Sequence, residues 1–249
     1  MCSGHPSKDA ARQMSDGRKR AETRTTIPPE TLDGCSTLPV QMRSTRTALL
    51  AGVLAWLAVA ACQAPGPPVP PDPGRVGLQA GDLPASLKRC PASGAVDGYL
   101  RSLQAANRAA HDELAAAWQD LKRRGAAQAA VTVYGERPTA CTARLGTGEG
   151  ASVSTMVVTF QAENAASDTY QRGFLGFTTL GADQEVDDMK RGAATGIGRN
   201  AWVLQRSVQG RALIVGLWER DQVAVLFIAV DEDPLHAKQA LSSVDGRIP

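Results

Sequence analysis

Histidines, cysteines and serines are the residues of this sequence that could act as bases, nucleophiles or metal ligands. From Cys62 onward the chain has two histidines, His111 and His236, and neither has a second histidine at the spacing of a metal-ligand pair. The same segment has neither the G-x-S-x-G nor the S-x-x-K pattern of serine acyl enzymes. We therefore expect no catalytic residue, no metal site and no cofactor. The sequence favours a non-enzymatic protein and leaves an enzyme open as an alternative.

A short apolar stretch comes directly before Cys62. Basic residues in Met42-Arg43-Ser44-Thr45-Arg46 are followed by the apolar residues 48–61, which is the order of a secretory signal peptide. Val59-Ala60-Ala61-Cys62 resembles the lipobox of bacterial lipoproteins. The resemblance implies a signal peptide over 42–61, a diacylglyceryl group on the Cys62 sulfur, and anchoring at the extracytoplasmic face of the cell membrane. The alternative is an uncleaved signal anchor, but a spanning helix needs about 20 apolar residues.

The residues before Met42 match no folded element. Residues 1–41 carry no apolar periodicity. We interpret them as a stretch that is not translated, with translation starting at Met42, or as a disordered extension. Residues 1–61 are accordingly left out of the predicted fold.

Two further cysteines, Cys90 and Cys141, follow Cys62. In an exported protein an even pair of cysteines predicts a disulfide bond. A metal site is the alternative, and two thiols without a nearby histidine or third cysteine are a poor set of zinc ligands. We therefore predict a Cys90–Cys141 disulfide.

Charge and composition argue against nucleic acid as a partner. The whole chain has a net charge of +2, and this excess of basic residues lies in residues 1–61. The remaining chain has acidic and basic residues in nearly equal number, so no basic binding surface is predicted. We expect a membrane contact through the lipid on Cys62, together with a small ligand or an envelope protein as partner.

A linker and one domain are predicted after the anchor. Six prolines lie between Gln63 and Gly74, and they favour an extended spacer. Residues 62–77 are therefore assigned to the lipidated cysteine and its linker, and residues 78–249 to a single extracytoplasmic domain. Asp82-Leu83-Pro84 has the residue types of a helix start.

The pattern of apolar residues predicts an α+β fold. A three- and four-residue apolar spacing indicates a long helix over 97–125 with a break near Asn107, and shorter helices are expected over 163–173 and 233–244. Stretches rich in valine, threonine and aromatic residues indicate five strands, 129–135, 152–161, 201–208, 212–218 and 223–230. We expect an antiparallel sheet of about five strands with helices packed on it, compatible with two strand–strand–helix halves.

Three other segments are candidates for function. The glycine-rich stretch 175–199 includes the acidic residues Asp183, Glu185, Asp187 and Asp188, and such loops often carry binding sites; a solvated loop is the alternative. The acidic run before Pro234 favours helix capping over calcium binding. The third candidate is a set of aromatic residues that could form a stacking cleft or, as we favour, part of the core: Trp118, Trp202, Trp218, Tyr170, Phe174 and Phe177.

Two segments near the C-terminus are Thr195-Gly196-Ile197-Gly198-Arg199-Asn200-Ala201-Trp202-Val203 and Trp218-Glu219-Arg220. They resemble segments of extracytoplasmic α+β lipoprotein and sensor domains of GC-rich bacteria, including the external domain of PknH-like kinases. The resemblance implies an antiparallel sheet with helices against it and no particular ligand residues. The sequence thus predicts a lipid-anchored binding or sensing module, with an envelope interaction or structural lipoprotein as the alternative.

Overall fold

The computed structural model describes residues 69–178, 187–198 and 200–249. The described residues all belong to one compact unit, Ala64–Pro249, which is the second of the two units into which the chain divides. Cys62 and the predicted signal peptide lie outside the described residues. The second unit contains two hydrophobic clusters and a disulfide bond. A hydrophobic core of its own is what a chain segment needs to fold independently.

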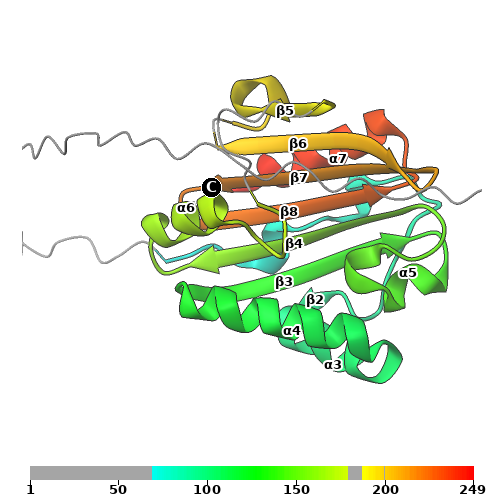
Figure 1. The fold of residues 1–249 in the computed structure, drawn as a ribbon, viewed down its shortest axis with the longest axis horizontal. Helices are drawn as coiled ribbons and strands as arrows, with labels where there is room; N and C mark the ends of the chain where they lie inside the picture. The colour runs from blue at the N-terminus through cyan, green and yellow to red at the C-terminus, as the bar shows by residue number, and fades with distance from the viewer. Residues whose placement is uncertain (1–68, 179–186, 199) are drawn as a thin grey trace, which may run out of the picture. The chain divides into compact units, whose positions relative to one another are not determined.

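One antiparallel sheet organises this unit (Figure 1), and it has eight strands in the order β1-β3-β4-β8-β7-β6-β5, with β2 paired to β3. The predicted α+β class and antiparallel pairing are confirmed, but the prediction of about five strands understates the sheet. The three additional strands contain only two or three residues each, too few to produce a periodic sequence pattern. The strands are β1 Lys88–Arg89, β2 Gly94–Ala95, β3 Ala126–Gly135, β4 Ser152–Phe160, β5 Met189–Arg191, β6 Ala201–Val208, β7 Arg211–Arg220 and β8 Val223–Val230.

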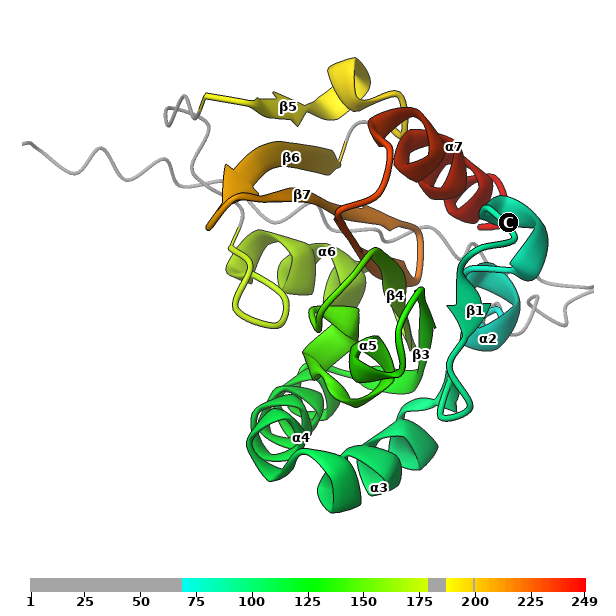
Figure 2. The same cartoon turned by 90° about the vertical axis from the view of Figure 1, so that its right-hand side faces the viewer.

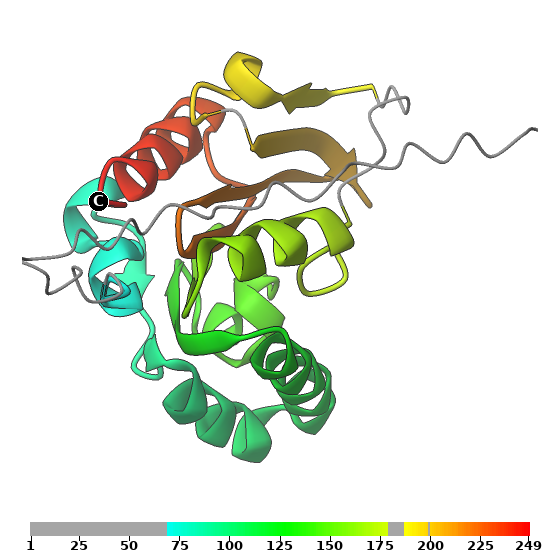
Figure 3. The ribbon, with the colours of Figure 1, turned by 90° about the vertical axis from the view of Figure 1, so that its left-hand side faces the viewer.

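Helices cover both faces of the sheet. Figure 2 shows α2 (Pro73–Val76) and α7 (Pro234–Asp245) on one face, which we call the α7 face. The opposite view in Figure 3 shows α3 (Val96–Ala106), α4 (Arg108–Arg123) and α6 (Glu163–Arg172) on the other, the α4 face. The short helix α5 (Pro138–Thr142) and the 3-10 turn η3 (Arg144–Gly146) connect β3 to β4.

Strand β8 lies in the middle of the sheet and is buried along its whole length. Its side chains alternate between the two hydrophobic clusters, as the two-residue period of a strand requires. This arrangement confirms the expectation that the continuous apolar run 223–230 is buried on both faces. One cluster takes Ala224, Leu226, Ile228 and Val230; the other takes Val223, Val225, Phe227 and Ala229.

Two successions of strand, strand and helix share the sheet. The first is β3–β4–α6 and the second is β7–β8–α7, and β4 pairs directly with β8. However, Ala166 of α6 packs in one hydrophobic cluster and Ala237 of α7 in the other. The two helices therefore lie on opposite faces of the sheet. A twofold axis perpendicular to the sheet does not relate the two successions.

The break predicted near Asn107 separates α3 from α4. Asn107 has φ −154°, and its side-chain oxygen accepts a hydrogen bond of 3.1 Å from the backbone N–H of Ala110. This is the geometry of an N-terminal helix cap. The end predicted at Gly125 is also close to the observed one, since α4 ends at Arg123 and Gly125 adopts φ +95°.

The folded domain begins before Leu78. Asp72 caps α2 by accepting a hydrogen bond from the Gly74 N–H, and Pro73 and Val76 are buried. The prediction of an extended linker up to residue 77 is therefore wrong for residues 73–76, because proline is well accommodated in the first turn of a helix.

The C-terminus packs beside α2 (Figure 2). The Arg247 guanidinium donates hydrogen bonds to the carbonyls of Val76 and Gly77 and to the Asp82 carboxylate. Asp82 is thus an ion-pair partner, and no helix starts at Pro84 as the sequence suggested.

Candidate functional site

The largest hollow that we describe is a groove of about 840 Å³ on the α7 face, at the end of the sheet formed by β5, β6 and β7. Strands β6 and β7 form its floor. Helix α7 forms one wall, and β5 with the following 3-10 turn η4 (Gly192–Thr195) forms the other. Its described lining consists of Asp188, Met189, Lys190, Thr195, Val203, Gln205, Arg206, Ser207, Gly210, Ala212, Ile214, Pro234, Lys238 and Leu241.

The floor follows from strand alternation. Val203, Gln205 and Ser207 are two residues apart on β6, so their side chains point to the same face of the sheet. In the β6–β7 register Val203 pairs with Gly216, and Gln205 pairs with Ile214. The floor is apolar toward Val203 and Ile214 and becomes polar and exposed at Gln205 and Ser207.

The α7 wall is fixed in place by a capped helix start and by a glycine. The Asp233 carboxylate accepts hydrogen bonds from the N–H groups of Leu235 and His236, with Pro234 in the first turn. This confirms the capping role predicted for the acidic run. Gly216 on β7 lets the helix approach closely, because a Cβ there would lie 2.8 Å from Leu241 Cδ1.

A tight hairpin turn forms one end of the groove. Gln209 has φ +53° and Gly210 has φ +79°, and two consecutive residues with positive φ form the two-residue turn that suits the twist of paired strands. The turn joins Val208 to Arg211 in register. It therefore extends β6 and β7 to the polar end of the floor.

The groove carries more basic than acidic side chains. Lys190 on β5 and Lys238 on α7 stand on opposite walls, and Arg206 and Asp188 border the groove. Within the described residues none of these four takes part in an ion pair. In contrast, ten arginines elsewhere in the domain do.

The glycine-rich segment 175–199 contributes to the groove. Asp188 lies at its border, and Met189, Lys190 and Thr195 line the wall formed by β5 and η4. The Thr195 hydroxyl is held within the wall, where it donates to the Gly192 carbonyl at 2.6 Å and accepts from the Ile197 N–H at 3.2 Å. Asp183 and Glu185 of the predicted acidic cluster lie outside the described residues.

The aromatic residues belong to the core, as favoured over a stacking cleft. Trp118 and Trp202 are buried in the cluster on the α4 face, whereas Trp218 is buried in the cluster on the α7 face. Phe177 packs against Trp202 with ring centroids 6.4 Å apart. None of the six aromatic side chains is among the described lining of the groove.

The two histidines lie apart from each other. His111 on α4 forms a 2.8 Å contact from Nδ1 to Asp112, which itself binds Arg108. His236 on α7 lies 3.3 Å from the Glu232 carboxylate. Across the described ranges, no three histidine, cysteine or acidic side chains are grouped so that they could hold a metal ion.

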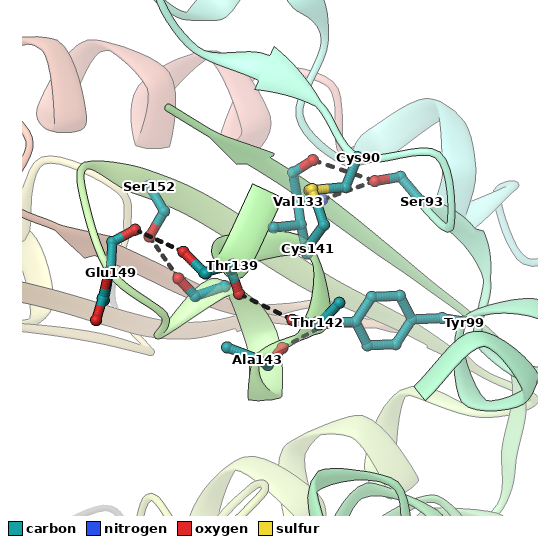
Figure 4. The surroundings of a disulfide bond; sticks show 11 residues. Cys90, Ser93, Tyr99, Val133, Thr139, Cys141, Thr142, Ala143, Glu149 and Ser152 are labelled. Carbon is teal, nitrogen blue, oxygen red and sulfur yellow. Dashed lines mark hydrogen bonds between the residues drawn. A yellow bond between two sulfur atoms is a disulfide. The ribbon is translucent and has the colours of Figure 1, made fainter. Parts of the chain in front are cut away.

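Cys90 and Cys141 form the predicted disulfide bond. Figure 4 shows its surroundings: Cys141 lies on α5, and Ser93 follows Cys90 and binds the backbone of Val133 on β3. The Cys90 N–H also donates to the Val133 carbonyl at 2.8 Å. The disulfide therefore links the α5 connection to the edge of the sheet formed by β1, β2 and β3.

Two carboxyl groups outside the groove have raised pKa values. Burial raises the pKa of Asp245, at the C-terminal end of α7, and the Arg220 guanidinium opposes this shift through bonds of 2.7 and 2.8 Å. Burial also raises the pKa of Glu219, whose carboxylate accepts a hydrogen bond from the Asn200 side chain. Both groups stabilise contacts between elements of the fold, since each is bonded to a neighbouring side chain.

A second hollow of about 300 Å³ lies between the end of α4 and the segment after α6. Both of its basic residues are paired: Arg124 pairs with Asp120 and donates to the Gly173 carbonyl, and Arg172 pairs with Asp168. Because these charges are already satisfied within the protein, the larger groove is the better candidate site.

Sequence reasoning did not identify the groove, because its floor and walls come from elements separated along the chain. Two signals were available: the candidate segment 175–199, which supplies one wall, and the exposed end of β6, where Gln205 and Ser207 face the same way as Val203. No protein-family model matches this sequence, and a search of curated proteins found no match. In the part of the chain that the structure describes, no helix has the length and apolar character needed to cross a membrane.

Proposed function

We propose that this protein is an exported lipoprotein, anchored through a lipid on Cys62, whose domain binds a ligand in the groove between α7 and β5. The groove is the observation that carries the binding function. Its volume of about 840 Å³ lies in the range of about 300–1,000 Å³ that is usual for small-molecule sites. An apolar floor with a few polar groups at its border is also typical of such sites.

Export is supported by two independent features. The segment before Cys62 has the order of residues of a signal peptide that ends in a lipobox. The Cys90–Cys141 bond is of the kind that forms and persists in oxidising compartments outside the cytoplasm. Together they support a protein held at the extracytoplasmic face of the cell membrane, with a folded domain that begins about ten residues after Cys62.

Metabolic labelling tests the anchor. Cells that express the full chain are grown with an alkyne-bearing fatty acid, and the protein is examined for label and for partition into the membrane fraction. We expect the wild-type chain to be labelled and Cys62→Ala to be unlabelled. Label retained on Cys62→Ala would contradict the anchor without touching the groove.

Native mass spectrometry of the protein released from its membrane tests the groove. We expect the wild-type protein to carry a non-covalent ligand mass. Ala212→Trp, which places a large side chain on the exposed floor, should lose that mass. The matched control is Ala105→Trp, at an exposed alanine of α3 on the other face. A ligand mass that survives in Ala212→Trp, or its absence from the wild-type protein, would contradict the proposal.

A further inference from the structure

Two lysines, Lys190 and Lys238, determine which ligand charge the groove favours. Lys238 follows Pro234 by four residues and precedes Leu241 by three, so the three residues form one stripe on α7 that borders the groove. Lys190 is the register partner of Val203 across the β5–β6 pair, so its side chain points to the face that carries the floor. The two ammonium groups thus come from opposite walls toward the same floor.

No described residue neutralises Lys190 or Lys238. Within the described residues, the remaining lysines each have a local partner: Lys88 donates to the Ala85 carbonyl, and the Lys122 ammonium lies over the Trp118 ring. The ammonium groups of Lys190 and Lys238 have no hydrogen-bond or ion-pair partner in this part of the chain, and Asp188 is the acidic residue that borders the groove with them. An anion bound between the walls would be attracted by both ammonium groups and would offset their positive charge.

The floor below them is suited to an apolar group. Ile214 and Leu241 are 7 % and 4 % exposed, and they form a surface to which Val203 and Pro234 also contribute. The floor from Val203 to Ser207 spans about 13 Å at the rise of a β-strand. A hydrocarbon chain laid along it contacts Val203 and Ile214 at the apolar end and passes Gln205 and Ser207 at the polar end.

From this combination we propose that the groove binds an anionic amphiphile, with its carboxylate or phosphate between Lys190 and Lys238 and its hydrocarbon chain on the floor of β6 and β7. This inference rests on the proposed function, because it names the chemical class of the ligand in that groove. It commits to a single-chain amphiphile that is free in solution or released from a membrane.

Calorimetric titration of the Ala64–Pro249 unit with defined probes tests the proposal. Dodecanoate supplies an anion with a chain, dodecyltrimethylammonium supplies the same chain with the opposite charge, and acetate supplies the anion alone. All are used below their micelle concentrations. We expect dodecanoate to bind at least about tenfold more tightly than the ammonium probe, since the latter places like charges together. Acetate should give no measurable binding, and dodecyl phosphate in parallel distinguishes a phosphate from a carboxylate headgroup.

The charge contribution is measured with a matched pair of double variants. Lys190→Gln/Lys238→Gln should weaken dodecanoate binding about tenfold, since each exposed charge contact contributes about a threefold effect. The control Lys88→Gln/Lys122→Gln removes the other two lysines of the described residues and should bind within about twofold of the wild-type unit. Binding by the wild-type unit should also weaken as salt is added.

Equal binding of the two charged probes would overturn the inference. No weakening in Lys190→Gln/Lys238→Gln, or no binding of dodecanoate and dodecyl phosphate at all, would do the same. Dodecanoate binding that persists in Ala212→Trp would place the amphiphile elsewhere and also overturn it. The proposed function fails separately, in the native mass measurement on the membrane-derived protein. A ligand mass in the native measurement, combined with equal calorimetric binding of dodecanoate and dodecyltrimethylammonium, would indicate a neutral ligand in the same groove.

Discussion

The disulfide bond between Cys90 and Cys141 gives the most quantitative prediction for this fold. The two cysteines are separated by 51 residues. On the chain-entropy model, closing a loop of this length lowers the entropy of the unfolded chain enough to stabilise the fold by about 4 kcal/mol at 25 °C. The double variant Cys90→Ala/Cys141→Ala should therefore lose about this much free energy of unfolding. Alanine is preferred to serine because Cys90 is fully buried and a hydroxyl there would need a partner.

Urea unfolding of the Ala64–Pro249 unit, followed by tryptophan fluorescence, measures the loss. The fluorescence reports on both faces of the sheet, because one cluster contains Trp118 and Trp202 and the other contains Trp218. Reduction of the wild-type unit should reproduce most of the loss without removing any atoms of the core. The double variant serves as the control, since reductant should leave it unchanged. A loss smaller than about 1 kcal/mol in both experiments would refute the loop-entropy reasoning for this bond.

Two further predictions concern a buried tyrosine and a close backbone contact. Burial raises the pKa of Tyr99 from 10.0 to about 12. Because the tyrosine of the unfolded chain ionises at the lower pH, the free energy of unfolding is constant below about pH 10 and falls as the pH rises toward 12. Wild-type protein should lose about 2–3 kcal/mol across this range, and Tyr99→Phe should lose clearly less in urea unfolding at each pH; identical pH profiles would contradict this. Gly148→Ala should lower the free energy of unfolding by about 1–3 kcal/mol, because its Cβ would lie 2.5 Å from the Thr139 carbonyl oxygen. The control Gly81→Ala has no atom within 4 Å of its Cβ and should be nearly neutral; equal thermal stability of the two variants would contradict the packing argument.

The parts of the fold that the sequence predicts are those decided by local pattern. The run Val223–Val230 is apolar at every position, so only a strand buried on both faces accommodates it. Asn107 interrupts the apolar spacing of the long predicted helix, and its side chain caps the start of the second helix, α4. The disulfide follows from the cysteine pair and the expected compartment.

The parts that the sequence does not predict depend on tertiary contacts. Strand β5 has three residues and is defined by its pairing with β6 rather than by a pattern. Helix α2 forms within a proline-rich stretch because Val76 and Pro73 can be buried and Arg247 binds the end of the helix. The groove needs Ile214 and Lys238 to come together from β7 and α7, and no local pattern specifies that juxtaposition.

The central claim is that the groove between α7 and β5 binds an anionic amphiphile. Backbone amide NMR spectra of the Ala64–Pro249 unit, recorded while dodecanoate is added, test it most directly. We predict saturable shifts centred on Val203, Ser207, Ile214 and Lys238, the residues of the floor and of the α7 wall. Shifts centred instead on Asp120, Arg124 and Gly173 around the smaller hollow, or a spectrum that does not change, would contradict the claim.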